Sequence, residues 1–264
     1  MFRRLKMKKP LIGFLTLSIA LTGFASPIEA EEKRSYHSDS VIEFVPSSEP
    51  SPPVDPEKPD PEKPVQPIDP TDPNGPEPGT QGPLSIDYVS SLDFGKNRIS
   101  NQDQVYYARA QTYQSGQKET PNFVQITDNR GTSNGWTLLV KQKDQLKAAD
   151  ATQKDVLIGA QITLAAPTVT SNTTSQAKPT ATNPISLIPG LAAVVLSAKA
   201  GSGSGLWVTY WGSVEEVEEQ KETGGSERVK VTKDIALSVP GVTPKSAVKY
   251  QTNLLWTLTD VPQN

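Results

Sequence analysis

The aromatic side chains are the residues of this chain whose chemistry best suits ligand binding. The tripeptide Trp-Thr-Leu occurs twice, at 136–138 and at 256–258, although the chain has only four tryptophans. An indole offers a large apolar face and one N–H donor, which suits stacking on the apolar face of a sugar ring. The same side chains also suit a hydrophobic core. Trp136 and Trp256 are therefore interpreted either as a binding device or as matched core anchors of two strands.

The other two tryptophans lie in a different setting. Trp207 and Trp211 fall on one side of a strand-like run that follows a glycine-rich loop at 201–205. We predict that both are exposed and available to a ligand. In contrast, the alternation of residues around Trp256 and Leu258 favours packing in a core.

Catalytic residue types are scarce. Beyond residue 83 the chain has no cysteine and no histidine, since its single histidine is His37. This composition excludes Ser-His and Cys-His arrangements and most zinc sites. No glycine-rich phosphate loop follows a strand and opens a helix, and no spacing singles out a pair of carboxylates. The sequence predicts a non-catalytic protein with no metal and no cofactor.

Charge is divided unevenly along the chain. Residues 31–83 carry 4 basic and 12 acidic side chains, whereas residues 84–264 carry 17 basic and 16 acidic side chains. The C-terminal part is therefore nearly neutral. It lacks the basic excess that binding to nucleic acid requires.

The N-terminus has the pattern of a secretory signal. A basic start is followed by about fourteen mostly apolar residues from Leu11 to Phe24, fewer than the roughly 20 that span a membrane. This predicts a signal peptide over residues 1–30, cleaved after Ala30 or alternatively after Ala25; an uncleaved N-terminal anchor is the other interpretation. No sorting signal or apolar tail closes the chain. We therefore expect a secreted protein without a transmembrane anchor, retained at the surface non-covalently.

Two segments separate the signal from the main domain. Residues 31–45 contain a short alternating stretch, which predicts either an edge strand docked on the domain or a loose tail. Residues 46–83 hold 14 of the 24 prolines, many in Asp-Pro pairs. Because proline fixes φ and removes the amide donor, we expect this segment to be a disordered, extended acidic linker.

Residues 84–264 show a dominant period of two, which is typical of half-buried strands. Turn residues separate the alternating runs, so the sequence predicts an all-β domain, a single β-sandwich of the Ig-like or Greek-key type. Residues 166–184 and the glutamate-rich stretch 214–222 are expected to be surface loops. The predicted strands lie at 104–113, 123–127, 135–140, 161–164, 192–196, 206–211, 228–231, 235–239 and 248–258.

The two motifs resemble those of the WxL-domain family of cell-surface proteins of low-GC Gram-positive bacteria. The first Trp-Thr-Leu resembles the family's first motif. The segment 250–262 is similar to its C-terminal motif Tyr-x-x-x-Leu-Thr-Trp-x-Leu-x-x-x-Pro, with Leu255 in place of the usual threonine. The Asp-Pro segment and the residues that follow it also resemble the family. Six motif residues carry over to this chain: Trp136, Leu138, Tyr250, Trp256, Leu258 and Pro262.

This resemblance implies non-covalent attachment to the cell wall, with peptidoglycan as the ligand class. It also implies multi-component complexes with co-encoded surface proteins, some membrane-anchored and some sortase-anchored. The alternative is a structural scaffold or adhesin that binds co-encoded surface proteins or host ligands, with both motifs serving only the fold. That alternative predicts Trp136 and Trp256 buried on neighbouring strands. In either case we expect the two motif segments to lie close together and close the fold.

Overall fold

The computed structural model describes residues 34–114, 116–149, 156–173, 177–220 and 224–262. The chain divides into two compact units, Met1–Glu43 and Phe44–Asn264, and every strand lies in the second. Across the described residues the secondary structure consists of strands and turns without a helix, which confirms the all-β prediction. The signal peptide predicted over residues 1–30 lies outside the described residues.

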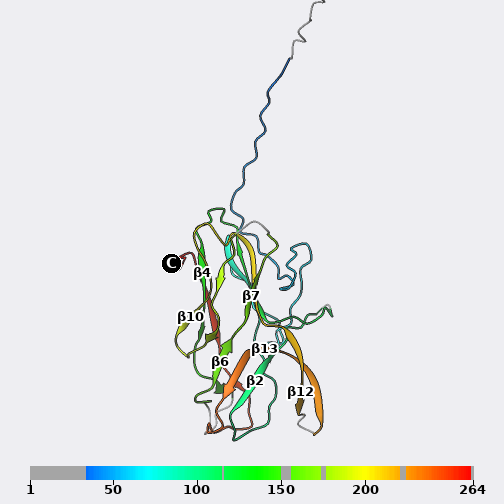
Figure 1. The fold of residues 1–264 in the computed structure, drawn as a ribbon, viewed down its shortest axis with the longest axis vertical. Helices are drawn as coiled ribbons and strands as arrows, with labels where there is room; N and C mark the ends of the chain where they lie inside the picture. The colour runs from blue at the N-terminus through cyan, green and yellow to red at the C-terminus, as the bar shows by residue number, and fades with distance from the viewer. Residues whose placement is uncertain (1–33, 115, 150–155, 174–176, 221–223, 263–264) are drawn as a thin grey trace, which may run out of the picture. The chain divides into compact units, whose positions relative to one another are not determined.

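The strands form three larger antiparallel sheets and one small pair (Figure 1). The central sheet has the order β1 (Leu84–Val89), β3 (Phe123–Asp128), β11 (Gly205–Trp211) and β7 (Pro167–Thr170). The motif sheet has the order β15 (Leu254–Thr259), β4 (Trp136–Gln142), β10 (Ala192–Ala198) and β8 (Thr180–Ala181). The β13 sheet has the order β12 (Val214–Gln220), β13 (Ser226–Val239), β6 (Gln161–Leu164) and β9 (Ile185–Ser186), and β2 (Gln104–Arg109) also pairs with β13. The small pair is β14 (Tyr250–Gln251) with β5 (Lys147–Ala148).

Several elements differ from the sequence prediction. The glutamate-rich stretch expected to be a loop is β12, which pairs with β13 along its whole length. Its glutamates are tolerated because β12 lies at the edge of its sheet, where charged side chains reach water. The expected loop 166–184 contains β7 and β8, and the two predicted strands at 228–231 and 235–239 belong to the single strand β13.

One hydrophobic core is shared by the three larger sheets. The central sheet contributes Ile126 and Trp207, the motif sheet contributes Leu138, and the β13 sheet contributes Ile162 and Ile235. All five side chains are at most 2 % exposed. The core is thus enclosed by strands from distant parts of the sequence, and it holds the motif sheet against one face of the central sheet.

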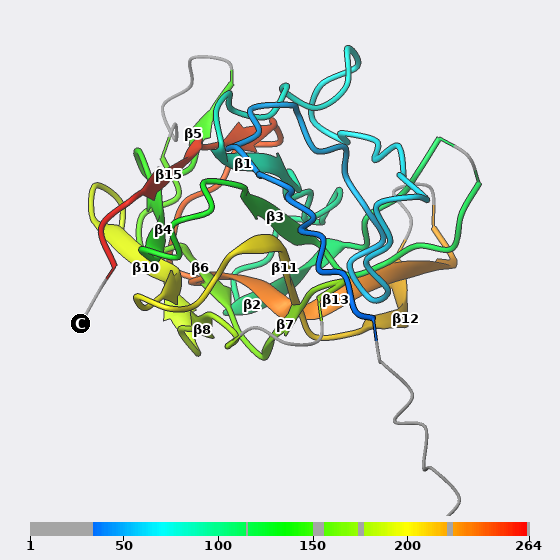
Figure 2. The same cartoon turned by 90° about the horizontal axis from the view of Figure 1, so that it is seen from above.

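The opposite face of the central sheet is covered by the proline-rich segment, so the expectation of a disordered, extended linker is wrong. We name residues 52–69 the strap. Its Val54 is 0 % exposed and its Val65 is 8 % exposed. A second buried cluster, the strap core, joins these two valines to side chains of the central sheet and its neighbours: Tyr88, Tyr113, Phe123, Leu206 and Val208. In Figure 2 the central sheet lies between the motif sheet and the strap.

The repeated Asp-Pro pairs fold the proline-rich segment instead of extending it. In each pair the aspartate Oδ1 accepts a hydrogen bond from the backbone N–H two residues on, at 2.9 Å for Asp55, 3.1 Å for Asp60, 2.7 Å for Asp69 and 2.8 Å for Asp72. These are Asx-turns, in which the side chain closes a local turn. The turns reverse the chain often enough that Val65 N–H donates to the Pro53 carbonyl at 2.8 Å.

Polar groups of the domain satisfy the strap backbone. Gln125 Oε1 accepts from Val54 N–H at 2.9 Å, and its Nε2 donates to the Pro52 carbonyl at 3.0 Å. Further along, Ile68 N–H donates to the Thr112 carbonyl at 2.9 Å. Proline removes N–H donors but leaves every carbonyl as an acceptor, so a proline-rich segment can pack against a domain that supplies the donors.

The segment before the strap is different. Residues 34–51 contain no strand, and Val41 and Phe44 are 94 % and 85 % exposed. The edge strand expected within residues 31–45 is therefore absent from the described part of that range. Over the described residues of the whole chain, no helix is long and apolar enough to span a membrane.

Candidate functional site

The two Trp-Thr-Leu motifs lie side by side on neighbouring strands. β15 pairs antiparallel with β4, which places Leu258 directly opposite Leu138 and Trp256 opposite Val140. The prediction that the motif segments lie close together is confirmed. They are 120 residues apart in the sequence, so this pairing joins the end of the folded unit to its middle.

Trp136 is part of the core and has no face available to a ligand. Its side chain is 0 % exposed, and its Nε1 donates to the Gly203 carbonyl at 2.9 Å. Gly203 has a φ of +80°, and a Cβ at that position would lie 2.7 Å from the same Nε1. The glycine-rich loop 201–205 is therefore a close-fitting cover for the indole, and Trp136 cannot stack on a sugar while the core is intact.

Trp256 is half-buried and packs against another tryptophan of the core. Its ring centroid lies 6.2 Å from that of Trp211, with the two planes inclined at 50°. Leu254 and Leu258 lie on the same inward side of β15, while Leu255 and Thr257 between them are exposed. The motif residues of β15 therefore form the inner half of an edge strand.

The remaining motif residues fix the ends of the C-terminal segment. The Tyr250 hydroxyl accepts from Ser246 N–H at 2.8 Å. Past β15, Thr137 Oγ1 donates to the Val261 carbonyl at 2.7 Å, next to the half-buried Pro262. The Thr137 bond ties the end of β15 to β4, and the Tyr250 bond closes a local turn before β15.

The prediction that Trp207 and Trp211 are exposed is wrong. They are 1 % and 3 % exposed and belong to the shared core. Trp207 Nε1 also donates to the Ser204 carbonyl at 3.0 Å. The physical reason is that β11 lies inside a sheet covered on both faces, by the motif sheet and by the strap, so neither side of the strand faces water.

The opposite side of the motif sheet carries a different set of residues, which we name the outer face. On β15 these are the residues between the motif positions, and Leu255 is 46 % exposed. Lys141 is the single charged residue in the set, and Thr137 is buried beneath the residues that follow β15. Three cross-strand rows make up the outer face: Thr259-Thr137-Ser197-Thr180, Thr257-Leu139-Val194 and Leu255-Lys141-Ala192.

A second candidate region lies along the strap. A hollow of about 920 Å³ opens between the strap and residues 170–173 at the end of β7. Three acidic and three basic side chains line it: Asp55, Glu57, Asp60, Lys58, Lys63 and Lys178. The docked strap forms one wall of this hollow. Because the sequence predicted a free linker here, it gave no indication of the hollow.

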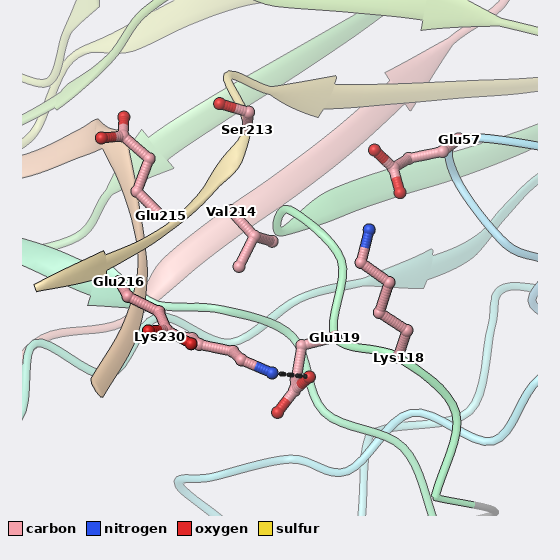
Figure 3. Close-up of a pocket in the computed structure, with 8 residues that line it drawn as sticks. All are labelled: Glu57, Lys118, Glu119, Ser213, Val214, Glu215, Glu216 and Lys230. Carbon is pink, nitrogen blue, oxygen red and sulfur yellow. Dashed lines mark hydrogen bonds and ion pairs between the residues drawn. The ribbon is translucent and has the colours of Figure 1, made fainter. Parts of the chain in front are cut away.

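A smaller hollow of about 270 Å³ adjoins the same strap at Glu57. Figure 3 shows the Lys118 side chain extending toward Glu57, and Lys230 Nζ lies 2.8 Å from Glu119 Oε2. The hydrogen bond with Lys230 lowers the pKa of Glu119, and the same contact raises the pKa of Lys230. With Glu215 and Glu216, four glutamates and two lysines line this hollow.

A buried carboxylate beneath the strap braces the glutamine that holds it. Asp87 is 8 % exposed and accepts hydrogen bonds from Thr127 Oγ1 at 2.6 Å, Ser85 Oγ at 2.7 Å and Gln125 Nε2 at 3.0 Å. Burial raises the pKa of Asp87, and these three hydrogen bonds oppose the increase. Among the described residues, no group of three or more His, Asp or Glu side chains could hold a metal ion.

A comparison with known protein families gives one match. The family described as WxL domain, surface cell wall-binding, matches residues 31–262. The matched range includes the strap, all of the sheets and both Trp-Thr-Leu motifs. Comparisons with curated proteins and with solved structures give no match.

Proposed function

We propose that this chain, which belongs to the WxL domain family of surface cell wall-binding proteins, attaches to peptidoglycan non-covalently and without catalysing a reaction. Family membership makes it a surface protein that binds the cell wall. The ligand class, the non-covalent mode and the absence of catalysis are the proposal. The outer face of the motif sheet is the observation that supports it.

The outer face has the chemistry expected of a surface for an uncharged polar polymer. Hydroxyl groups of threonine and serine can donate and accept hydrogen bonds, and the aliphatic side chains of Leu139, Val194 and Leu255 can pack against the apolar faces of sugar rings. With Lys141 as its one charged residue, binding should depend little on salt.

This proposal gives the six motif residues a positioning role. Trp136, Leu138, Trp256 and Leu258 occupy the inward side of β4 and β15, and successive residues of a strand point to opposite sides. The motif therefore fixes two strands whose other side is the binding surface. In this account the indoles support wall binding without touching the wall.

Charges placed on the outer face test the proposal. The double variant Leu255→Glu with Thr257→Glu should weaken binding to purified sacculi by about tenfold or more, equivalent to about 1.4 kcal/mol, and leave the melting temperature nearly unchanged. Val242, which is 91 % exposed and outside the outer face, provides the control variant Val242→Glu. Undiminished binding by the double variant would contradict the proposal.

The variant Trp256→Ala tests whether the Trp256 indole supports the fold or contacts the wall. We expect this variant to lose thermal stability together with wall binding, because it removes the ring that packs against Trp211. A variant that melts like the wild type but leaves the sacculi would assign the indole to the ligand instead.

The second candidate function is assembly with other surface proteins, as a scaffold or adhesin. The observation that favours it is the position of β15, which pairs with β4 alone among the described strands and leaves its other edge free. Such an edge can accept a strand from another protein. Co-encoded membrane-anchored and sortase-anchored proteins are the proposed partners. Sacculi stripped of protein distinguish the two functions, because wall binding survives the stripping and binding through a protein partner does not.

A further inference from the structure

We propose that the two hollows along the strap form a single binding groove for a peptide that carries both carboxylate and ammonium groups, as the peptide stems of the wall polymer do. We name the two hollows together the strap groove. This inference rests on the proposed attachment to peptidoglycan, and it identifies the part of the polymer that the strap groove binds.

The strap groove has walls that are already in place. Thr170 Oγ1 donates to the Pro56 carbonyl at 2.8 Å and so ties the end of β7 to the strap. The next residue, Ser171, accepts from Thr173 N–H at 3.1 Å through its Oγ, which also donates to the Leu206 carbonyl. A site whose walls are ordered before binding loses less conformational entropy when the ligand arrives.

The larger hollow offers ammonium groups to a carboxylate. Asp55 is occupied by the backbone N–H groups of its own turn and by Gln117, and Asp60 is paired with Lys63 at 2.9 Å. Two lysines on the facing walls are less engaged. Lys178 Nζ makes one long hydrogen bond, of 3.5 Å, to the Val169 carbonyl. The Lys58 ammonium makes no hydrogen bond within the described part of the chain.

The smaller hollow offers carboxylates to an ammonium. Glu119 pairs with Lys230 at 2.8 Å and Glu215 pairs with Lys233 at 2.7 Å, so Glu57 and Glu216 are the two glutamates of this hollow without an ion pair among the described residues. Glu57 belongs to both hollows. The lysines of the larger hollow and the two unpaired glutamates of the smaller hollow therefore adjoin where the hollows meet, at Glu57. A peptide with a carboxylate near one end and an amine near the other matches this order.

Other wall components fit the strap groove less well. Trp207 touches the larger hollow but is only 1 % exposed, so it offers no platform on which a sugar ring could stack. A polyanion that continued into the smaller hollow would meet Glu57 and Glu216. Peptide bonds, in contrast, can pair with the side-chain amides of Gln117 and Asn172, which both line the hollow.

Soluble wall fragments and the full-length protein test the inference. The probes are peptide stems released from sacculi by an amidase, and glycan chains freed of stems in the same digestion. We expect calorimetry to detect binding of the stems. The variant Lys58→Glu with Lys178→Glu should weaken that binding by about tenfold or more, which is about 1.4 kcal/mol. Both lysines are exposed, so the melting temperature should stay the same.

A matched charge reversal elsewhere serves as the control. Lys143 and Lys249 are exposed and line neither hollow, so Lys143→Glu with Lys249→Glu should bind stems like the wild type. Stems that do not bind, or that bind the groove variant as tightly as the wild type, would overturn the inference. If intact sacculi still bind in that case, the inference alone has failed. If neither sacculi nor stems bind, the proposed function has failed with it.

Discussion

Replacing Val54 by alanine measures whether the strap is part of the folded unit. Val54 is 0 % exposed in the strap core, 30 residues before the start of the predicted domain at residue 84. A free linker would not respond to this change, because its side chains would be solvated in both the folded and the unfolded protein. A docked strap must respond, since the truncation leaves a cavity against the central sheet.

The expected size of the effect follows from the buried volume. Val→Ala removes two methylene equivalents at about 0.8 kcal/mol each, and incomplete collapse of the cavity adds a further cost. We expect a loss of about 2 kcal/mol in the free energy of unfolding. For a folded unit of this size, about 2–4 °C per kcal/mol gives a melting temperature lower by about 4–8 °C.

Thermal melts of the full-length protein, followed by circular dichroism, provide the assay. Val242→Ala makes the same chemical change at a side chain that is 91 % exposed, and it should leave the melting temperature unchanged. Limited proteolysis should also cut the strap faster in Val54→Ala than in the wild type. Equal melting temperatures for Val54→Ala and the wild type would refute the docked strap.

Two further predictions concern the glycine-rich cover and the buried carboxylate. Gly203→Ala should destabilise the protein more than Gly201→Ala in denaturant titrations: both residues have positive φ, but a Cβ at 203 would meet Trp136, whereas one at 201 meets nothing within 4 Å. An equal loss of stability in the two variants would show that backbone strain alone, without the contact with Trp136, causes the destabilisation. Burial raises the pKa of the Asp87 carboxyl above its ordinary value of 3.8, so the folded state binds the proton of this carboxyl more tightly than the unfolded state does. The free energy of unfolding should therefore fall as the pH rises from about 3.8 to the raised pKa. Melts across that range should show a smaller decrease for Asp87→Asn, and an unchanged slope would contradict the assignment.

The fold class was predictable because alternation is a local property of the sequence. Strands such as β3, β4, β6 and β11 begin and end close to the predicted runs. The strand β12 was missed because its glutamates suggested a solvated loop, and edge strands accept such residues. Its two half-buried valines, Val214 and Val217, are three residues apart and so lack the period of two that indicates a strand.

The strap, in contrast, left a signal in the sequence. Each Asp-Pro pair is followed by a residue whose N–H can return to the aspartate, as Glu57 does for Asp55 at 2.9 Å. This pattern indicates Asx-turns and therefore a folded course. The docking itself had no local signal, because Gln125, which binds Val54 and Pro52, lies more than 70 residues further along the chain.

The sequence by itself determined the all-β class, the lack of His and Cys in the domain, and the two matched motifs that identify the family. The tertiary structure decided which aromatic side chains reach water. A period of two shows that a strand has two faces, but it carries no information about what covers each face. Trp207 and Trp211 are buried because distant segments, the motif sheet on one side and the strap on the other, enclose the central sheet. For the same reason the candidate surfaces, the outer face and the strap groove, appear only once the chain is folded.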